Sequence, residues 1–189
     1  QLAEHALSAY FPDADAADPG AALLRRAVAA TARLTARWMV AGFVHGVLNT
    51  DNMNVSGESF DYGPWRWLPA WDPAFTAAYF DHSGLYAFGR QPEAVYWNCG
   101  QMAIALRLLA DSPPLLAALE RFGPLYQAAL ARRFLWRLGV QSGGDEADIA
   151  LVSAAEGHMR DAAVAPDQFF FRHRGGRNPP DGEFGTLLA

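Results

Sequence analysis

Residues that could perform metal-assisted chemistry gather in one short stretch of the sequence, residues 45–62. Asp51 and Asn52 are adjacent there, and Asp61 lies at the far end of the same stretch. A carboxylate can orient or deprotonate an incoming hydroxyl, and an Asn and an Asp can hold Mg²⁺ against nucleotide phosphates. These three side chains therefore suit the transfer of a phosphoryl or a nucleotidyl group.

The middle of this stretch has the pattern of a tight hairpin. Residues 54–55 and 59–60 flank Ser56-Gly57-Glu58, and the glycine can adopt the positive φ that a tight turn needs. Pairing of the two flanks would bring the two ends of the stretch together. The sequence therefore predicts that Asp51 and Asn52 lie close to Asp61.

A calcium-binding loop is one alternative for the same residues. Counted from Asn52, loop ligands would stand at Asn54 and Ser56, with Gly57 at the sharp turn. Gly63, however, occupies the position where such loops carry a bidentate glutamate. The early ligands would also be neutral, so a calcium ion would be poorly compensated.

A plain structural loop is the other alternative, with Asp and Asn side chains bonded to nearby main-chain groups. The order of the residues favours catalysis instead. In protein kinases the base comes first, a metal-binding Asn follows, and the aspartate of an Asp-Phe-Gly motif comes after a short hairpin. Asp51, Asn52 and Asp61-Tyr62-Gly63 follow this order. We interpret His45 as a packing and hydrogen-bonding residue, because support of a catalytic loop needs no titration.

Helices are expected on both sides of this stretch. Asp18-Pro19 is a helix-start signal, and apolar residues at three- and four-residue steps predict a helix over about residues 21–40. The other expected helices cover residues 2–10, the segment from Pro92 with a buried stripe of Val95, Cys99, Met102, Leu106 and Leu109, residues 114–138 with a break at Gly123-Pro124, and residues 145–164 with Asp145 as the cap.

The remaining segments are expected to be irregular. Residues 63–92 are rich in Pro, Gly and aromatic residues, and they predict a long loop pinned to the core by its aromatic side chains. Phe169-Phe170-Phe171 is expected to be a short apolar anchor. The Gly/Pro-rich tail from Arg174 is expected to be mobile.

Composition limits the classes of function. The 189 residues suffice for one domain or one large lobe, and a hydrophobic content of 51% can build a packed core. The net charge of -5 argues against a nucleic-acid binder that works through a basic surface. The single cysteine, Cys99, excludes an internal disulfide and a cysteine-based zinc site, and we expect it in the core. No apolar run is long enough to span a membrane.

The basic residues of the chain are unusual in type. All 15 are arginine, so the chain has no lysine. A kinase-like enzyme normally places a lysine on the nucleotide phosphates. We therefore expect the site to be incomplete in this chain alone.

Longer motifs run through most of the chain. They read His-Gly-Val-Leu-Asn-Thr-Asp-Asn-Met at 45–53, Asp-Tyr-Gly-Pro at 61–64, Asp-His-Ser-Gly at 81–84 with Tyr86 and Phe88 after it, Gln91-Pro92, and Trp97-Asn98. Together they resemble the SelO (YdiU) family, whose members are protein adenylyltransferases with a pseudokinase fold. The resemblance runs from the first helix to about Phe171.

The resemblance implies a fold, a reaction and a set of site residues. The fold would be mainly α with a short β-hairpin, the C-lobe of a protein-kinase-like (α+β) fold over residues 1–173, followed by the tail 174–189. The reaction would transfer AMP from ATP to Ser, Thr or Tyr hydroxyls of proteins. Asp51 would be the catalytic base, Asn52 and Asp61 would bind Mg²⁺ or Mn²⁺, and Asp61 would also contact ATP. His45 and Asn49 would support the catalytic loop.

The chain also departs from the family pattern. Leu48 stands where Met is frequent, and Leu85 stands where Arg is common. The N-terminal nucleotide-binding lobe, with its phosphate-binding lysine and partner glutamate, has no counterpart, and neither has the C-terminal Cys or selenocysteine motif. We therefore expect the C-lobe alone, with weak ATP binding and negligible turnover. The expected partners are ATP, protein substrates and the missing lobe, without nucleic acid or membrane, and the expected location is cytoplasmic.

Two competing functions remain open at this stage. A small-molecule kinase of the aminoglycoside or choline type would carry its catalytic Asp directly after His-Gly, where this chain has Val47 and reaches Asp51 only later. A non-catalytic interaction domain could keep the fold without the activity.

Overall fold

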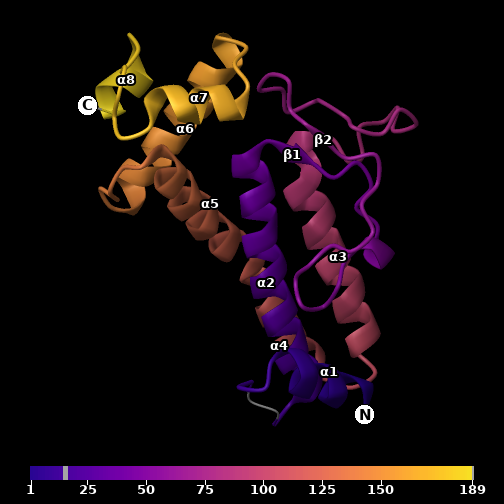
Figure 1. Ribbon diagram of the computed structural model, residues 1–189. Helices are drawn as coiled ribbons and strands as arrows, with labels where there is room; N and C mark the ends of the chain where they lie inside the picture. Colours follow the sequence, from indigo (N-terminus) through magenta and orange to yellow (C-terminus); the bar gives the residue numbers. More distant parts are fainter. Residues whose placement is uncertain (15–16, 189) are drawn as a thin grey trace.

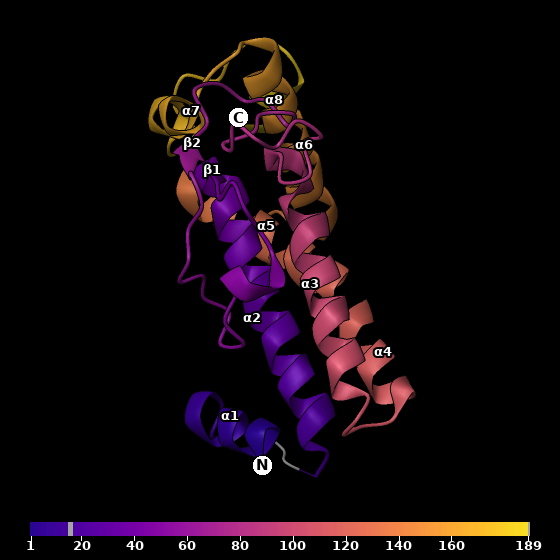
Figure 2. The ribbon, with the colours of Figure 1, turned by 90° about the vertical axis from the view of Figure 1, so that its right-hand side faces the viewer.

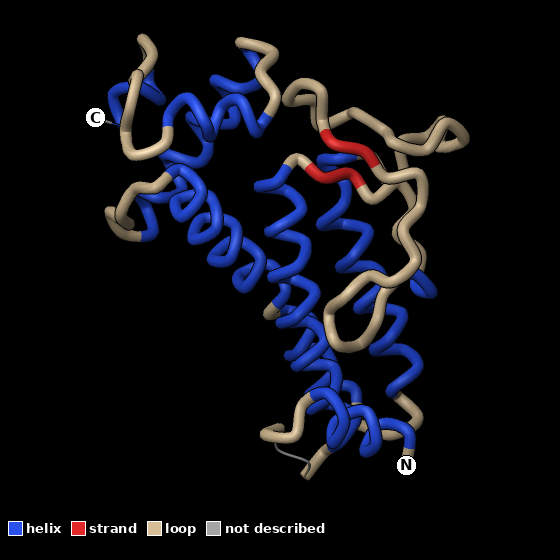
Figure 3. The backbone as a smooth tube through the Cα atoms, in the orientation of Figure 1, coloured by secondary structure: helices blue, strands red, loops and turns tan. Residues whose placement is uncertain are grey.

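A computed structural model describes residues 1–14 and 17–188, and within them the chain is mainly helical (Figure 1, Figure 3). The helices are α1 (Leu2–Tyr10), α2 (Pro19–Ala41), α3 (Gln91–Leu106), α4 (Ser112–Glu120), α5 (Phe122–Leu138), α6 (Asp145–Asp161), α7 (Pro166–His173) and α8 (Glu183–Leu188). Two 3-10 turns, η1 (Thr50–Asn52) and η2 (Phe88–Arg90), lie in the long loop region. Strands β1 (Phe43–Val44) and β2 (Arg66–Trp67) pair antiparallel.

Helix α2 is the centre of the fold. Its start follows the predicted signal, since the Asp18 side chain accepts a hydrogen bond from the main-chain N–H of Ala21 at 3.0 Å. It ends at Gly42, whose φ of 70° lies in the left-handed region. Many of its buried residues are alanines, which let α3 and α5 approach it closely. Figures 1 and 2 show α3 lying alongside α2 along much of its length.

The apolar side chains form two main cores that both include residues of α2. One core runs along α2 from Ala21 to Trp38 and joins it with α3 and α4, and it includes Leu24, Val28, Val95 and Leu115. The other joins the C-terminal end of α2 with α5 to α8 and the aromatic loop, and it includes Met39, Trp71, Phe88, Phe134 and Phe169. The loop that carries the candidate site runs between β1 and α3, against the side of α2 (Figure 3).

The predicted hairpin is present only as a turn. Gly57 has a φ of +82°, and the N–H of Asn54 donates to the carbonyl of Glu58 at 2.8 Å. The flanks, however, meet at one isolated bridge between Met53 and Ser59, and the sheet forms instead between β1 and β2 outside the turn. Side chains explain the difference, because Asn52 and Ser59 occupy main-chain carbonyls that a longer ladder would use.

Helix α3 matches the predicted stripe except at its end. Val95, Cys99 and Leu106 are buried, and the Cys99 sulfur lies 3.4 Å from the Thr31 hydroxyl, so the cysteine is a core residue. The prediction was wrong for Leu109, which is 61% exposed because the helix ends at Leu106. The predicted stripe was therefore one helical turn too long.

Two further boundaries differ from the expectation. The break in residues 114–138 lies at Arg121, and Gly123-Pro124 belong to the first turn of α5, where a proline needs no N–H partner. Asp145 is the first residue of α6 rather than its cap. Asp148 instead binds the preceding loop, accepting from the Ser142 hydroxyl at 2.6 Å and from the Gly143 N–H at 2.9 Å.

The C-terminal part contains more helix than its composition predicts. Phe169 and Phe170 are buried as predicted for an anchor, whereas Phe171 is 90% exposed because the three lie on one helix, α7. The tail from Arg174 contains α8, which buries Phe184 and Leu188 against the α6 and α7 side chains. A six-residue helix is too short to show a periodic pattern. Residue 189 of the predicted tail lies outside the described residues.

No helix in the described part of the chain combines the length and the apolar character that a membrane span needs.

Candidate functional site

His45 begins the candidate catalytic loop and is completely buried. Its main-chain N–H donates to the side-chain oxygen of Gln91 at 2.9 Å, and the Gln91 amide nitrogen donates back to the carbonyl of Phe43 at 2.9 Å. Gln91 is also fully buried and opens α3. One glutamine therefore fixes the end of β1, and the start of the loop, to α3.

The His45 ring links the two ends of the turn. The N–H of Val47 faces ring atom Nδ1 at 3.4 Å, which leaves Nε2 as the protonated nitrogen that donates to the Ser59 hydroxyl at 2.7 Å. Ser59 in turn donates to the main-chain carbonyl of Asn52 at 2.8 Å. Burial lowers the pKa of His45 to about 4, although the carboxylate of Asp61 acts in the opposite direction. A neutral, fully bonded imidazole supports the predicted structural role of His45.

Asn52 connects the candidate catalytic loop to Asp61. Its side-chain oxygen accepts from the N–H of Asn49 at 3.1 Å, and its amide nitrogen donates to the main-chain carbonyl of Asp61 at 2.9 Å. Asn52 is only 6% exposed, so both contacts are shielded from water. The structure therefore brings Asn52 and Asp61 together, as the sequence pattern predicts.

The two carboxylates of the site remain available. Asp51 and Asp61 are both exposed, and neither carboxylate takes part in an ion pair or a side-chain hydrogen bond within residues 1–14 and 17–188. Asp51 lies in η1, directly before the buried Asn52. Hydrogen bonds thus fix the neutral side chains of the site, whereas its two carboxylates are exposed.

The donor set fits a small divalent cation. Asp51 and Asp61 offer carboxylate oxygens, and the Asn52 oxygen keeps one lone pair free after accepting from Asn49. Hard oxygen ligands of this kind suit Mg²⁺ or Mn²⁺. Within the described residues, no group of three or more His, Cys, Asp and Glu side chains could hold a metal. A cation here would therefore depend on the Asn52 amide and on a ligand from outside the chain, such as a nucleotide phosphate.

Tyr86 supports the loop from the other side, and its contribution was not assigned from the sequence. Its hydroxyl donates to the side-chain oxygen of Asn49. Burial raises the pKa of Tyr86, and the nearby carboxylates of Asp81 and Asp51 add to this effect, so the hydroxyl keeps its proton. Asn49, a predicted support residue, is thus held by a tyrosine that also lies close to Asp51.

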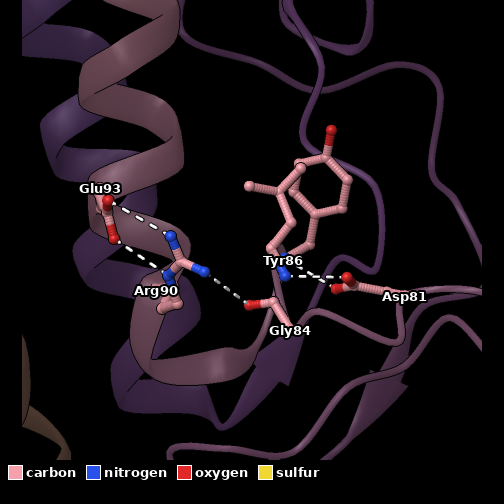
Figure 4. A network of polar contacts seen from close by, with 6 residues as sticks. Asp81, Gly84, Tyr86, Arg90 and Glu93 are labelled. Carbon is pink, nitrogen blue, oxygen red and sulfur yellow. Dashed lines mark hydrogen bonds and ion pairs between the residues drawn. The ribbon is translucent and has the colours of Figure 1, made fainter.

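Asp81 and Arg90 shape the segment that carries Tyr86 (Figure 4). The Asp81 carboxylate accepts from the N–H groups of Leu85 and Tyr86, both at 2.8 Å. Arg90 donates to the carbonyl of Gly84 at 3.4 Å and pairs with Glu93 at 3.1 Å. In Figure 4 the Tyr86 ring points away from both clusters. In the sequence, the Asp-His-Ser-Gly motif at 81–84 marked this segment, but its spacing did not indicate what Asp81 binds.

Asn98 is the remaining buried support of the loop. Its amide nitrogen donates to the carbonyl of Leu48 at 3.0 Å, three residues before Asp51, while its side-chain oxygen has no hydrogen-bond partner in the described part of the chain. The candidate catalytic loop is therefore bound to α3 at two points, by Gln91 at its start and by Asn98 in its middle.

Comparison with known proteins decides the family. The sequence profile described as "Protein adenylyltransferase SelO" matches residues 1–179. The chain belongs to the SelO family. The predicted resemblance is thereby confirmed, and the site described above lies within the matched region.

Several curated relatives of this chain carry the name "Protein nucleotidyltransferase YdiU". One from a Synechococcus strain is 40% identical over 183 residues, which are 92% of this chain and 36% of the relative. One from Pseudarthrobacter chlorophenolicus is 40% identical over 182 residues, 90% of this chain and 37% of the relative. One from Pseudomonas paraeruginosa is 42% identical over 173 residues, 91% and 35% respectively. The chain thus spans little more than a third of the length of these relatives.

Proposed function

We propose that this chain is the base- and metal-bearing lobe of a protein adenylyltransferase, with the architecture of a kinase-like C-lobe. The proposal rests mainly on one observation. The Asn52 side chain reaches the main chain of Asp61 at 2.9 Å and accepts from Asn49 at 3.1 Å, so one buried amide joins the two halves of the site. Membership of a family of nucleotidyltransferases supports the choice of reaction.

In this reaction Asp51, Asn52 and Asp61 have separate roles. The hydroxyl oxygen of a Ser, Thr or Tyr acceptor attacks the α-phosphorus of ATP, the bond from that phosphorus to the bridging oxygen breaks, and pyrophosphate leaves. Asp51 accepts the proton of the hydroxyl, which its exposed, unpaired carboxylate can do. Asn52 and Asp61 would hold Mg²⁺ or Mn²⁺, which supplies charge stabilisation for the phosphates.

The neutral network around the site keeps these residues in place. His45 is uncharged at neutral pH and donates to Ser59, so it orients the loop without taking the proton of the acceptor. Tyr86 and Asn49 brace the loop near Asp51. Preorganised groups of this kind lower the cost of assembling the reactive arrangement.

Charge argues that the chain works together with another segment. The described site contains two free carboxylates, and the chain has no lysine that could meet the nucleotide phosphates. We propose that the phosphate-binding cation comes from outside this chain, and that the chain alone binds ATP weakly with negligible turnover.

Labelled ATP tests the reaction. The whole protein that contains this chain is incubated with ATP labelled at the α- or at the γ-phosphate, Mg²⁺ or Mn²⁺, and a protein acceptor. The proposal expects label in protein only from the α-position, and its loss in Asp51→Asn and Asp61→Asn variants. Incorporation from the γ-position would instead identify a kinase, and incorporation from neither would favour a non-catalytic domain.

A further inference from the structure

A large groove opens beside the catalytic loop. It has a volume of about 1040 Å³ and lies between α3, α4 and the segment 85–86. Its walls carry apolar side chains that are strongly exposed, among them Trp97 at 57%, Ile104 at 61% and Leu116 at 57%. Exposed apolar side chains that gather in one concave place usually mark a binding surface.

The inner end of the groove belongs to the candidate active site. Leu48, Asn49 and Tyr86 line it, and Asn49 stands two residues before Asp51 in the sequence. Asn49 and Tyr86 are joined by the hydrogen bond that braces the loop. A molecule in the groove would therefore lie beside the loop that carries Asp51, the proposed catalytic base.

The outer end of the groove carries a free positive charge. Arg107, which follows the last residue of α3, lines the groove. Within residues 1–14 and 17–188 its guanidinium forms no ion pair and no side-chain hydrogen bond. Arg90, which also lines the groove, is by contrast paired with Glu93. The groove thus offers an acidic group one unpaired partner, Arg107.

We propose that this groove docks an extended segment of the acceptor protein, with apolar side chains against α3 and α4 and an acidic residue on Arg107. This inference rests on the proposed function, because it assumes a polypeptide acceptor at Asp51. An extended chain suits the groove because apolar side chains give binding energy and one charge fixes the register.

The geometry sets the spacing of the docked segment. Asn98, beside Leu48, and Arg107 are nine residues apart along α3, which corresponds to about 14 Å of helix. An extended peptide covers that length in about four residues. With the step from Asn49 to Asp51 added, the acidic residue should stand about five or six residues from the acceptor hydroxyl, with apolar residues between them.

A displayed peptide library tests the docking without any transfer of AMP. The probe is a library of peptides of about twelve residues, each with one central serine and random residues elsewhere, selected on this chain in the absence of ATP. The expected result is enrichment of peptides that combine apolar residues with an Asp or Glu about five or six positions from the serine.

Matched variants then locate the binding. Leu116 lines the groove, whereas Leu108 is 89% exposed and lies outside it. The variants Leu116→Glu and Leu108→Glu therefore make the same change inside and outside the groove. An enriched, fluorescently labelled peptide should bind Leu116→Glu at least about tenfold more weakly than the wild-type chain and Leu108→Glu unchanged. Arg107→Glu should shift the selected acidic residue to a basic one.

The outcomes separate this inference from the proposed function. No enrichment of the apolar-acidic pattern, or equal binding by Leu116→Glu and Leu108→Glu, would overturn the docking groove even if label from the α-phosphate still reaches protein. Enrichment with the expected variant effects would support the groove even if transfer failed, because the selection contains no ATP.

Discussion

The amide nitrogen of Asn52 donates to the main-chain carbonyl of Asp61 at 2.9 Å, across a turn that is closed by only one isolated bridge. This contact, rather than a ladder of main-chain hydrogen bonds, holds the two halves of the candidate site together. The geometry of the proposed metal ligands therefore depends on a buried side chain.

Removal of this side chain should cost stability as well as function. Asn52→Ala leaves the Asp61 carbonyl and the Asn49 N–H without their partners, so we expect the free energy of unfolding to fall by about 1–3 kcal/mol. Urea unfolding measures the loss. Asn54→Ala, in the same loop, removes one long 3.5 Å contact and should change stability by less than about 1 kcal/mol. Equal losses in both variants would contradict the linking role of Asn52.

The buried His45 should make stability depend on pH. Its pKa is lowered from 6.5 to about 4 by burial, so between these values the unfolded chain binds more protons than the folded one. Stability from this group is complete above pH 6.5 and falls as the pH drops towards 4. Between pH 7 and pH 5 we expect a loss of about 2 kcal/mol.

His45→Gln isolates this effect, because Gln can still donate to Ser59 without titrating. The comparison is needed because burial raises the pKa of Glu156, which changes stability with pH in the opposite direction. Urea unfolding at both pH values should show a weaker loss on acidification in the variant. The same loss in both proteins would show that His45 does not control it.

The turn at Gly57 should tolerate no side chain. Its φ of +82° strains any other residue, and a Cβ there would lie 2.8 Å from the carbonyl carbon of Ala30 in α2. We expect Gly57→Ala to destabilise the protein by about 1–3 kcal/mol in thermal or urea unfolding. Gly157→Ala, within α6 and with open space around it, should instead stabilise by about 0.5–1 kcal/mol. If Gly157→Ala destabilised the protein and Gly57→Ala did not, this explanation of the turn would be refuted.

Asp81 should control the order of the segment that braces Asn49. Its carboxylate binds the N–H groups of Leu85 and Tyr86, so Asp81→Ala should expose both amides to solvent exchange. Hydrogen exchange followed by NMR should show faster exchange at these two amides and at Asn49. Ser83→Ala, whose hydroxyl makes only a 3.4 Å contact with Asp81, is the control and should leave their protection intact.

The sequence predicted the helices and the closeness of Asn52 to Asp61 well, because their signals are local, whereas the catalytic and metal-binding roles of these residues stay predictions. The Asp18-Pro19 start, the α3 stripe and the order of Asp51, Asn52 and Asp61 each depend on near neighbours in the chain. It predicted poorly what depends on distant contacts. Pairing of β1 with β2 spans the whole catalytic loop, and Gln91 and Asn98 reach that loop from α3. Packing of α8 likewise depends on aromatic side chains of α6 and α7 rather than on its own six residues.

Binding of Mn²⁺ together with ATP tests the central claim most directly, because paramagnetic broadening of NMR signals detects even weak binding to this chain. We predict that amide signals of residues 49–52 and 61–62 broaden first in the wild-type chain. The same broadening should occur in Asp72→Asn, an exposed aspartate outside the site, and should be lost in Asp61→Asn. Broadening that is absent from these residues, or that persists unchanged in Asp61→Asn, would contradict the proposed metal-nucleotide site.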